Sequence, residues 1–412
     1  MTLFNKTQNI KVLHLNFDDD QSGASKAVYR IHSSLIKRKI ESSVLVVNKY
    51  SNFKNYISFS KNQILINFFK RFFSFIVKNF QNINSVNIHR SYNFFDNNQI
   101  TQFINNSNFD VIHIHWINGE MLSIDDIIKI KKPIVWTLHD LWPVLPTQHI
   151  YNKKTMPALK KSKWENYFLN KKKHLFQSKK ISIVCPSEFV KKQLPKWFTK
   201  KNQKIKVIPN TIDFNKWKPN DVLKSRRLLN LPVKNKFLTF HLPGKDDDFI
   251  KGTDIFVKIL KNFKKNKNIK FITFGSNRNE IHNLSNNLYS FGFIKNSLVL
   301  KNIYNASDLV ISTSRFESFG QVMLEANSCG VTCIGNYHTA VREIINNNKN
   351  ILVKNFSSKV YQTKIEKYLK KTVYKKRKSI SKILFDKFNE NKVAESYVKY
   401  YKETIKTFEN IN

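Results

Sequence analysis

The fold of this chain is indicated most clearly by the stretch Arg315-Phe-Glu-Ser-Phe-Gly-Gln-Val-Met-Leu-Glu-Ala-Asn-Ser-Cys-Gly330. The segment Asp308-Leu-Val-Ile-Ser-Thr313 before it predicts a short buried parallel strand. Ser318 and Gln321 have the spacing of a capping box, which predicts that a helix begins at Ser318. The glycine that closes the stretch is expected to end this helix, and the run 331–335 predicts the next strand.

Two carboxylates, Glu317 and Glu325, lie eight positions apart in this stretch. Glu317 is expected on the loop at the carboxyl end of the strand, where open α/β sheets bind ligands. Glu325 is expected one helical turn beyond Gln321 on the same face, and the N–H groups near Gly320 between the two acids predict an anion site. A sugar nucleotide carries hydroxyls at both ends and a diphosphate in the middle, so an acid on each side of a phosphate-binding site would suit it. The spacing alone leaves open the alternative of two solvated acids at a helix end.

Glycine usage points to the same region. The chain has only 9 glycines in 412 residues, whereas about 7% is usual. Glycine is favoured where φ is positive or where the backbone approaches a ligand closely. We therefore expect turns and phosphate contacts where the glycines gather, although ordinary strand-to-helix turns explain some of them. Seven of the nine lie in the segment 244–335: Gly244, Gly252, Gly275, Gly292, Gly320, Gly330 and Gly335.

Composition limits the classes of protein. A length of 412 residues suggests two domains. With 71 basic and 29 acidic residues the net charge is +42, which attracts nucleic acid, anionic lipid or phosphorylated substrates. The basic residues are spread along the chain without a nucleic-acid-binding motif, so no specific nucleic acid is expected. The three cysteines, Cys185, Cys329 and Cys333, are too few and badly spaced for a disulfide framework or a zinc site.

The chain shows no signal-peptide pattern and no apolar run of about 18 residues, which predicts a cytoplasmic protein. The segment 64–80 has a helical period with one narrow polar stripe, and its remaining residues are nearly all Phe, Ile, Leu or Val. Such a helix suits peripheral binding to an anionic membrane, such as the inner face of the plasma membrane. A helix buried between sheet and solvent is the alternative. The stripe consists of Asn67, Lys70, Arg71, Ser74 and Lys78.

Strands alternate with helices along the chain, which predicts a doubly wound α/β architecture. A linker is expected at 209–219, and a second α/β unit begins near 237. Helices are expected at 23–32 and 153–180, and the terminal segment is expected to pack back as an amphipathic helix. The strands expected in the two halves are 11–15, 44–47, 111–115, 134–138, 181–184 and 205–208, then 237–240, 269–274 and 289–291.

Taken together, these motifs resemble the family-4 retaining glycosyltransferases, whose signature is two glutamates separated by seven residues. The chain is similar to bacterial enzymes of exopolysaccharide and colanic-acid-type synthesis. The resemblance implies the α/β GT-B fold, with two Rossmann-like doubly wound domains facing a cleft. An acceptor-binding domain would span 1–216, with 391–412 packed back on it, and a donor-binding domain 217–390. The matching pieces are 22–30, 113–116, 139–143, 186–187, 208–210, 251–252 and Tyr397 with Tyr401.

The resemblance further implies transfer of a sugar from a UDP- or GDP-linked donor to a lipid-linked or growing surface glycan. Three catalytic residues follow from it. Glu317 would hold hydroxyls of the donor sugar, Lys251 would meet the charge of the leaving diphosphate, and His139 would contact the donor sugar or the developing oxocarbenium. The family favours front-side departure, in which the donor's own phosphate oxygen takes the acceptor proton. Each lysine or histidine taken alone could instead be structural.

The resemblance also implies a set of donor-binding residues. Glu325 would hold the ribose hydroxyls, Gly23 would approach the diphosphate, and Lys245 would replace a family arginine. Asn210 is either a hinge cap or a sugar contact. No cofactor and no metal are expected, so the aspartate runs 18–20 and 246–248 are predicted to be solvated loops rather than divalent-ion sites. The full predicted donor set is Gly23, Asn210, Lys245, Phe293, Ser318, Phe319, Gly320 and Glu325.

Two other functions remain open at this point. One is a nucleic-acid-binding protein that uses its charge of +42, which predicts tight binding with a steep salt dependence. The other is a GT-B-shaped sugar-nucleotide epimerase, which predicts an epimer as the product.

Overall fold

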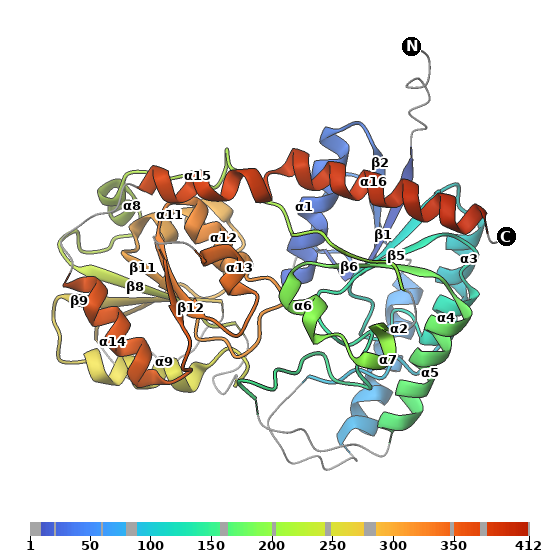
Figure 1. Ribbon diagram of the computed structural model, residues 1–412, viewed down its shortest axis with the longest axis horizontal. Helices are drawn as coiled ribbons and strands as arrows, with labels where there is room; N and C mark the ends of the chain where they lie inside the picture. The colour runs from blue at the N-terminus through green and yellow to red at the C-terminus, as the bar shows by residue number, and fades with distance from the viewer. Residues whose placement is uncertain are drawn as a thin grey trace. The chain divides into compact units, whose positions relative to one another are not determined.

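The computed structural model describes residues 10–19, 22–58, 61–79, 89–156, 164–199, 203–243, 249–275, 286–346, 350–370 and 377–410. Its contacts divide the chain into two compact units, coloured along the chain in Figure 1. Unit 1 is Met1–Tyr151, Leu159–Thr211 and Glu390–Asn412, and unit 2 is Asn152–Ala158 and Ile212–Asn389. The units therefore change at 211/212 and 389/390, and not at the predicted 216/217 and 390/391. Unit 2 also contains the short segment Asn152–Ala158.

Unit 1 is built on a seven-stranded sheet with the order β3-β2-β1-β4-β5-β6-β7. All neighbouring strands are parallel. The strand order reverses between β1 and β4, the position where ligands of such sheets bind. The six predicted strands are present, and the short β3 is additional. The strands are β1 Lys11–Asp18, β2 Glu41–Asn48, β3 Tyr56–Ser58, β4 Val111–Ile114, β5 Ile134–Thr137, β6 Ile181–Cys185 and β7 Ile205–Val207.

The last helix of the chain belongs to unit 1. Tyr397 and Tyr401 of this helix are fully buried in one core cluster with Val12 and Val111 of the sheet and Ile31 of the first helix. The predicted amphipathic spacing therefore corresponds to a real apolar face. The helices of unit 1 are α1 Gly23–Lys37, α2 Lys61–Asn79, α3 Asn98–Asn106, α4 Ile124–Lys129, α5 Glu165–Ser178, α6 Glu188–Gln193, α7 Lys196–Thr199 and α16 Glu390–Glu409.

Unit 2 is built on a six-stranded parallel sheet with the order β10-β9-β8-β11-β12-β13. Here the order reverses between β8 and β11. The strand that was expected at 308–313 is β11, and the one expected at 331–335 is β12. Sequence reasoning missed the short β13. The strands are β8 Lys236–His241, β9 Ile269–Phe274, β10 Leu288–Ser290, β11 Leu309–Ile311, β12 Thr332–Asn336 and β13 Ile351–Val353.

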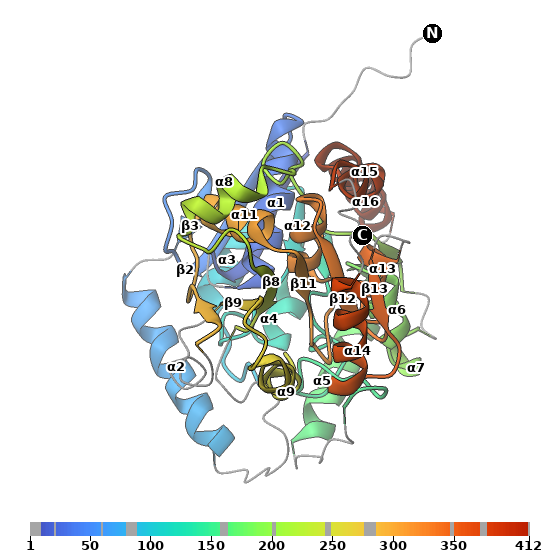
Figure 2. The same cartoon turned by 90° about the vertical axis from the view of Figure 1, so that its left-hand side faces the viewer.

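Helices cover both faces of this second sheet, as Figure 2 shows. Successive strand residues point to opposite faces. Phe237 and Val310 pack with α11, α12, α13 and α15, and Leu238 and Ile311 pack with α9 and α14. The helices are α8 Val222–Leu228, α9 Thr253–Phe263, α11 Ser297–Ala306, α12 Gln321–Ser328, α13 Val341–Ile345, α14 Ser358–Leu369 and α15 Arg377–Phe388.

Two local predictions were right only in part. The chain passes from unit 1 to unit 2 within the expected linker 209–219, but part of this segment is core, because Trp217 is 4% exposed and its ring lies 5.8 Å from that of Tyr304. The lysine-rich segment 153–180 is helical only from Glu165 to Ser178 among its described residues. Lys172 in this helix is fully buried. Its ammonium group is satisfied inside the protein because it donates to the carbonyl oxygens of Trp142, Leu145 and Pro146.

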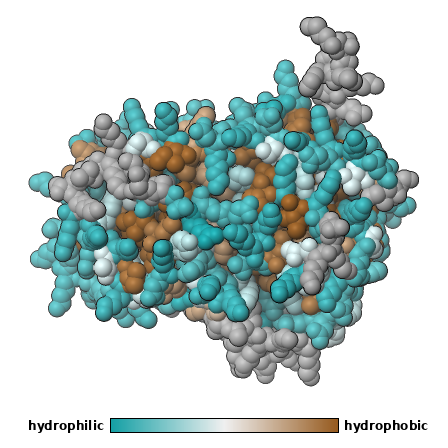
Figure 3. Space-filling view, viewed as in Figure 1, coloured by the Kyte–Doolittle hydropathy of each residue, from teal (hydrophilic) through white to brown (hydrophobic). Residues whose placement is uncertain are grey.

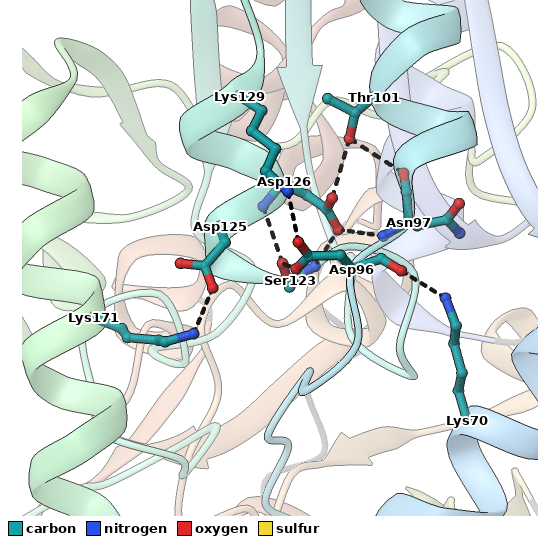
Figure 4. A network of polar contacts seen from close by, with 9 residues as sticks. All are labelled: Lys70, Asp96, Asn97, Thr101, Ser123, Asp125, Asp126, Lys129 and Lys171. Atoms are coloured by element: carbon teal, nitrogen blue, oxygen red, sulfur yellow. Dashed lines mark hydrogen bonds and ion pairs between the residues drawn. The ribbon is translucent and has the colours of Figure 1, made fainter.

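Helix α2 lies on unit 1 with its polar stripe facing inward. Asn67 donates to the carbonyl of Glu120 at 2.8 Å, and Ser74 donates to the Glu120 carboxylate at 2.6 Å. Lys70 donates to the carbonyl of Asp96 at 2.7 Å. Asp96 is itself held by Lys129 and Ser123, and this network is drawn in Figure 4. Hydrogen bonds, and not apolar packing, therefore attach the polar stripe of this helix.

The apolar face of α2 points to solvent. Hydrophilic side chains cover much of the face drawn in Figure 3, with several apolar patches between them. The alternative of a helix buried between sheet and solvent is therefore wrong. The side chain of Lys78 lies outside the described side chains. Five phenylalanines of α2, Phe68, Phe69, Phe72, Phe73 and Phe75, are each between 52% and 61% exposed.

Candidate active site

The candidate site of unit 2 lies where two loops leave β8 and β11, on either side of the point where the strand order reverses. Two hydrogen bonds tie the loops together. The N–H of Arg315 donates to the carbonyl of Ile250 at 2.7 Å, and the hydroxyl of Thr313 donates to the carbonyl of Lys251 at 2.9 Å. The loop that bears Glu317 is therefore fixed against the loop that bears Lys251.

Gly252 makes this close approach possible. It is the N-cap of α9 and has a φ of 69°, in the left-handed region. A Cβ at this position would lie 1.9 Å from the carbonyl oxygen of Thr313. No other residue type fits both the conformation and the space. The glycine predicted to mark a ligand-facing turn is thus required by the contact between two loops.

Lys251 and Glu317, two of the predicted catalytic residues, form an ion pair. The Lys251 Nζ lies 2.7 Å from Glu317 Oε1, and the hydroxyl of Ser314 donates to the same oxygen at 2.9 Å. The two side chains are 23% and 20% exposed. A cation and an acid are therefore held together at the ligand-binding edge of the sheet and stay accessible from solvent.

Arg315 reinforces this arrangement, although nothing in the sequence singled it out. Its guanidinium forms a two-pronged ion pair with Asp254 at 2.7 and 2.8 Å. It also donates to the carbonyl of Phe249 at 2.6 Å and lies 3.7 Å from the centroid of the Phe249 ring. Paired N–H groups on a carboxylate give geometric specificity as well as energy. The start of α9 is thereby fastened to the loop before Glu317.

A second support comes from Asn152, which lies far away in the sequence. Asn152 is 1% exposed, and its amide donates to the carbonyls of Arg315 and His338 at 2.8 Å each. Thr155 donates to the same Arg315 carbonyl at 2.6 Å. Because these partners are more than 150 positions away from Asn152 in the sequence, no local pattern could have predicted the contact.

Helix α12 starts differently from the prediction. The expected capping box from Ser318 to Gln321 is wrong, because Gly320 is the N-cap, with a φ of 96° and no side-chain cap. The left-handed conformation of Gly320 turns the chain into the helix, so α12 begins at Gln321. The first turn of α12 therefore receives no hydrogen bond from an N-cap side chain.

Two predicted donor residues are buried. Phe319 is 4% exposed and lies in the core, with its ring 5.8 Å from that of Phe388. Glu325 is 3% exposed and accepts a hydrogen bond from the hydroxyl of Tyr304 at 2.8 Å. The structure therefore brings Glu317 and Lys251 together at the surface, whereas Glu325 lies within the unit.

The other predicted residues of unit 2 are more dispersed. Phe293 follows β10 and is 45% exposed. Ser318 lies on the loop between β11 and α12. Lys245 and the aspartates at 246–248 lie outside the described residues.

In unit 1, His139 is the outer end of a row of hydrogen-bonded histidines. His139 Nε2 lies 2.9 Å from His115 Nδ1, and His115 Nε2 lies 2.9 Å from His14 Nδ1. His139 follows β5, His115 follows β4 and His14 lies on β1. Burial lowers the pKa of His139 to about 4, so the ring is uncharged at neutral pH.

His113 lies beside this row but belongs to another pair of contacts. Its Nδ1 lies 2.7 Å from the hydroxyl of Tyr401, and its Nε2 lies 2.7 Å from that of Thr137. One ring nitrogen from each of His14, His113 and His115 lies within 4.8 Å of the others. A metal ion there would have to displace the hydrogen bonds that occupy both nitrogens of His113 and of His115.

The remaining predicted residues of unit 1 differ in exposure. Gly23 begins α1, is exposed, and a Cβ there would meet no atom within 4 Å. Asn210 is 3% exposed, and its Oδ1 has no hydrogen-bond partner among the described residues. Asp18 and Asp19 are buried and accept hydrogen bonds from Ser25 and Ser51 respectively. The prediction of a solvated acidic loop is therefore wrong for these two aspartates.

Comparison with known families identifies the chain. The model of Glycosyltransferase Family 4 matches residues 21–216, and the model of Glycosyl transferases group 1 matches residues 247–384. Together they cover most of the chain. This protein is a family 4 glycosyltransferase.

Known proteins similar to this glycosyltransferase include an uncharacterized 41.2 kDa protein in the cps region of Klebsiella pneumoniae. It is 23% identical over 315 residues, which are 71% of this chain and 79% of the relative. The GT-B fold is shared with sucrose-phosphate synthase from Thermosynechococcus elongatus (TM-score 0.70, 14% identity, 97% and 100% of the two chains). It is also shared with Anabaena HepE solved with UDP and glucose (TM-score 0.65, 16% identity, 96% and 100%).

The neighbourhood of His139 in this glycosyltransferase contains an acid that sequence reasoning did not interpret. Asp140 accepts hydrogen bonds from Trp116 Nε1 at 3.1 Å, from the Trp142 N–H at 2.9 Å and from His149 at 2.6 Å. Burial acts to raise the pKa of Asp140, but His149 and these donors outweigh it and the pKa is lowered. Asp140 thus stays ionised and holds the loop that follows His139.

Proposed function

We propose that this glycosyltransferase acts with retention, moving a sugar from a nucleotide-sugar donor to a lipid-linked or growing surface glycan. The observation that carries the proposal is the ion pair of Lys251 with Glu317 at the edge where the strand order of unit 2 reverses. Departure of a nucleoside diphosphate develops negative charge on its phosphates, and a fixed cation stabilises that charge. The neighbouring carboxylate offers an acceptor for sugar hydroxyls.

We propose the following roles for the residues of unit 2. Lys251 faces the diphosphate, and the first turn of α12 after Gly320 adds N–H groups and the helix dipole. Glu317 binds hydroxyls of the donor sugar while Ser314 keeps its Oε1 in place. Since Glu325 is buried and bonded to Tyr304, a ribose hydroxyl would have to join that existing hydrogen bond.

The roles that we propose for His139 and Gly23 of unit 1 rest on the family resemblance and on the surroundings of each residue within its own unit. An uncharged His139 does not repel an oxocarbenium, and it can exchange a hydrogen bond with the donor sugar. The open space at Gly23 leaves room for a phosphate group near the start of α1. The acceptor hydroxyl attacks from the face that the diphosphate leaves, and a phosphate oxygen of the donor takes the proton. This path requires no protein nucleophile.

Two similar proteins guide the choice of substrates to test. The solved structures of Anabaena HepE contain UDP, UDP with glucose, and UDP-glucose, so UDP-sugars come first and GDP-sugars second. WaaG is a glycosyltransferase involved in lipopolysaccharide biosynthesis and shares the fold with a TM-score of 0.60 and 13% identity over 93% and 95% of the two chains. A surface glycan is therefore the first acceptor class to test.

The reaction can be tested without knowing the acceptor. Purified protein incubated with a panel of UDP- and GDP-sugars should slowly release nucleoside diphosphate and free sugar, because water replaces the missing acceptor. Proton NMR should show that the first sugar released keeps the anomeric configuration of the donor. Release of the opposite anomer would contradict retention, and an epimerised nucleotide-sugar would contradict transfer. No turnover of any donor in the panel would contradict the proposed substrate class.

We also propose that the protein binds peripherally to anionic membranes through α2. No helix of the described part of the chain has both the length and the apolar character that crossing a bilayer requires. The solvent-facing rings of α2 instead suit insertion at the depth of the lipid headgroups, and the net charge of +42 attracts anionic lipid. Because hydrogen bonds of the polar stripe hold α2 on unit 1, the exposed rings can enter lipid while the helix stays attached to the protein.

Replacing Phe72 and Phe73 together with Ser should release the protein from vesicles that contain anionic lipid. Each ring that leaves lipid forfeits about 2 kcal/mol of transfer free energy, so the double variant should bind at least 100-fold more weakly in a sedimentation assay. Leu228 and Leu298 in unit 2 are 60% and 62% exposed, and replacing both with Ser is the matched control. Equal release by both variants would contradict docking through α2.

Neither of the other two functions is proposed. Both family models that match the chain describe glycosyltransferases, and nothing in the comparisons favours a nucleic-acid-binding protein or an epimerase. The epimer assay above tests the second of these directly.

A further inference from the structure

The histidine row of unit 1 constrains where the protons of His139 lie. Only two hydrogen bonds connect the row, one from His14 to His115 and one from His115 to His139, each 2.9 Å long. Burial lowers the pKa of all three rings, so each is neutral and carries one N–H and one bare nitrogen. Each hydrogen bond in the row uses one N–H proton, and His115, the middle ring, can supply only one of them.

Two arrangements satisfy this condition. In the first, His14 Nδ1–H donates to His115 Nε2, and His115 Nδ1–H donates to His139 Nε2. In the second, both bonds run the other way, so that His139 Nε2–H donates to His115 and His115 Nε2–H donates to His14. The outer nitrogen of His139, Nδ1, carries a proton in the first arrangement and is bare in the second.

The inner end of the row decides between the two. His14 is fully buried, and its Nε2 has no hydrogen-bond partner within the part of the chain that the structure describes. The second arrangement would place an N–H on this nitrogen with no acceptor, whereas the first leaves only a bare lone pair. Buried N–H groups without acceptors are rarer in proteins than buried acceptors without donors.

We propose that His115 is a positioning residue that, anchored by His14, fixes His139 as the Nδ1–H tautomer, so that His139 offers a hydrogen-bond donor to its ligand. His139 is half-buried, and its Nδ1 has no partner among the described residues. The group that meets it must therefore be an acceptor, such as a sugar hydroxyl oxygen or a phosphate oxygen. His139 is then a donor from the start and not a general base at that nitrogen.

The statement that this ligand is the donor sugar rests on the proposed function, but the tautomer itself does not. Long-range proton–nitrogen NMR of the full chain labelled with 15N-histidine measures the tautomer without any ligand, and loss of one signal set in His139→Gln assigns His139. Wild-type protein should show the proton on Nδ1. A proton on Nε2 would overturn the inference, and this result does not depend on whether a His115 variant folds.

A variant tests whether His115 causes the tautomer. In His115→Phe the donor to His139 Nε2 is gone, so His139 should shift to the Nε2–H form that free imidazole side chains prefer. His32→Asn is the control, because His32 bonds to Ser42 and lies outside the row. An unchanged His139 in His115→Phe would overturn the role of His115. If the tautomer is as expected but no UDP- or GDP-sugar moves the His139 signals, the proposed function fails and the inference stands.

Discussion

Replacing Lys251 with Ala should lower kcat by about 100- to 1,000-fold, the usual cost of losing one group that stabilises a developing anion. The Lys251 ammonium is the cation paired with Glu317 at 2.7 Å, so the variant removes the charge that we propose stabilises the leaving diphosphate. The fold should survive, because the pair is partly exposed and such pairs contribute only about 1 kcal/mol. Ser314 also remains as a partner of Glu317. Steady-state kinetics with the nucleotide-sugar identified in the hydrolysis assay measure the loss.

The control for this variant must remove the same charge nearby. Lys258 lies on α9, the helix that begins just after Lys251 and Gly252, and is exposed, so Lys258→Ala should keep full activity. Lys251→Arg keeps the charge but changes its shape and reach, and it should recover only part of the rate. Equal rates in wild type and Lys251→Ala would show that this cation plays no part in the reaction.

The Gly252→Ala variant should be strongly destabilised, with a loss of about 3 kcal/mol of unfolding free energy. Part of the loss comes from the left-handed backbone at a φ of 69°, which costs a residue with a Cβ about 1–2 kcal/mol. The rest comes from the clash at 1.9 Å with the Thr313 carbonyl. Because that carbonyl belongs to the backbone of the loop bearing Glu317, the clash can be relieved only by moving the loop. Chemical denaturation followed by circular dichroism measures the loss.

Gly23→Ala is the matched control for stability alone. A Cβ at Gly23 meets no atom within 4 Å, so its unfolding free energy should stay within about 0.5 kcal/mol of the wild-type value. If both alanine variants proved equally stable, the two loops of unit 2 would not be in the close contact described here.

Local sequence patterns predicted most of the strands, because parallel strands that are buried on both faces are continuous apolar runs. They failed where a local signal competed with tertiary packing. Ser318 and Gln321 fit a capping box, but Gly320, with its φ of 96°, begins the helix instead. The polar stripe of α2 was recognised, but whether it faces solvent or protein depends on Glu120 and Asp96, whose positions no local pattern reveals.

The residues of the candidate site show the same difference between local sequence signals and long-range contacts. Lys251 and Glu317 were predicted because the family motifs mark them, and the structure joins them through an ion pair. The supports of the site were missed, since Arg315 reaches Asp254 and Asn152 reaches Arg315 across long sequence separations. Glu325 was expected to face a ligand from its helical spacing, but its side chain is buried and accepts a hydrogen bond from the hydroxyl of Tyr304 on α11.

Calorimetric titration of wild type and Lys251→Ala with UDP and with GDP tests the central claim most directly. A charge-assisted contact to phosphate contributes about 1.5–3 kcal/mol, so the variant should bind the preferred nucleotide roughly 10- to 100-fold more weakly. Lys258→Ala should bind it as wild type does. No binding of either nucleotide to wild type, or equal affinity in wild type and Lys251→Ala, would contradict a diphosphate site built on Lys251.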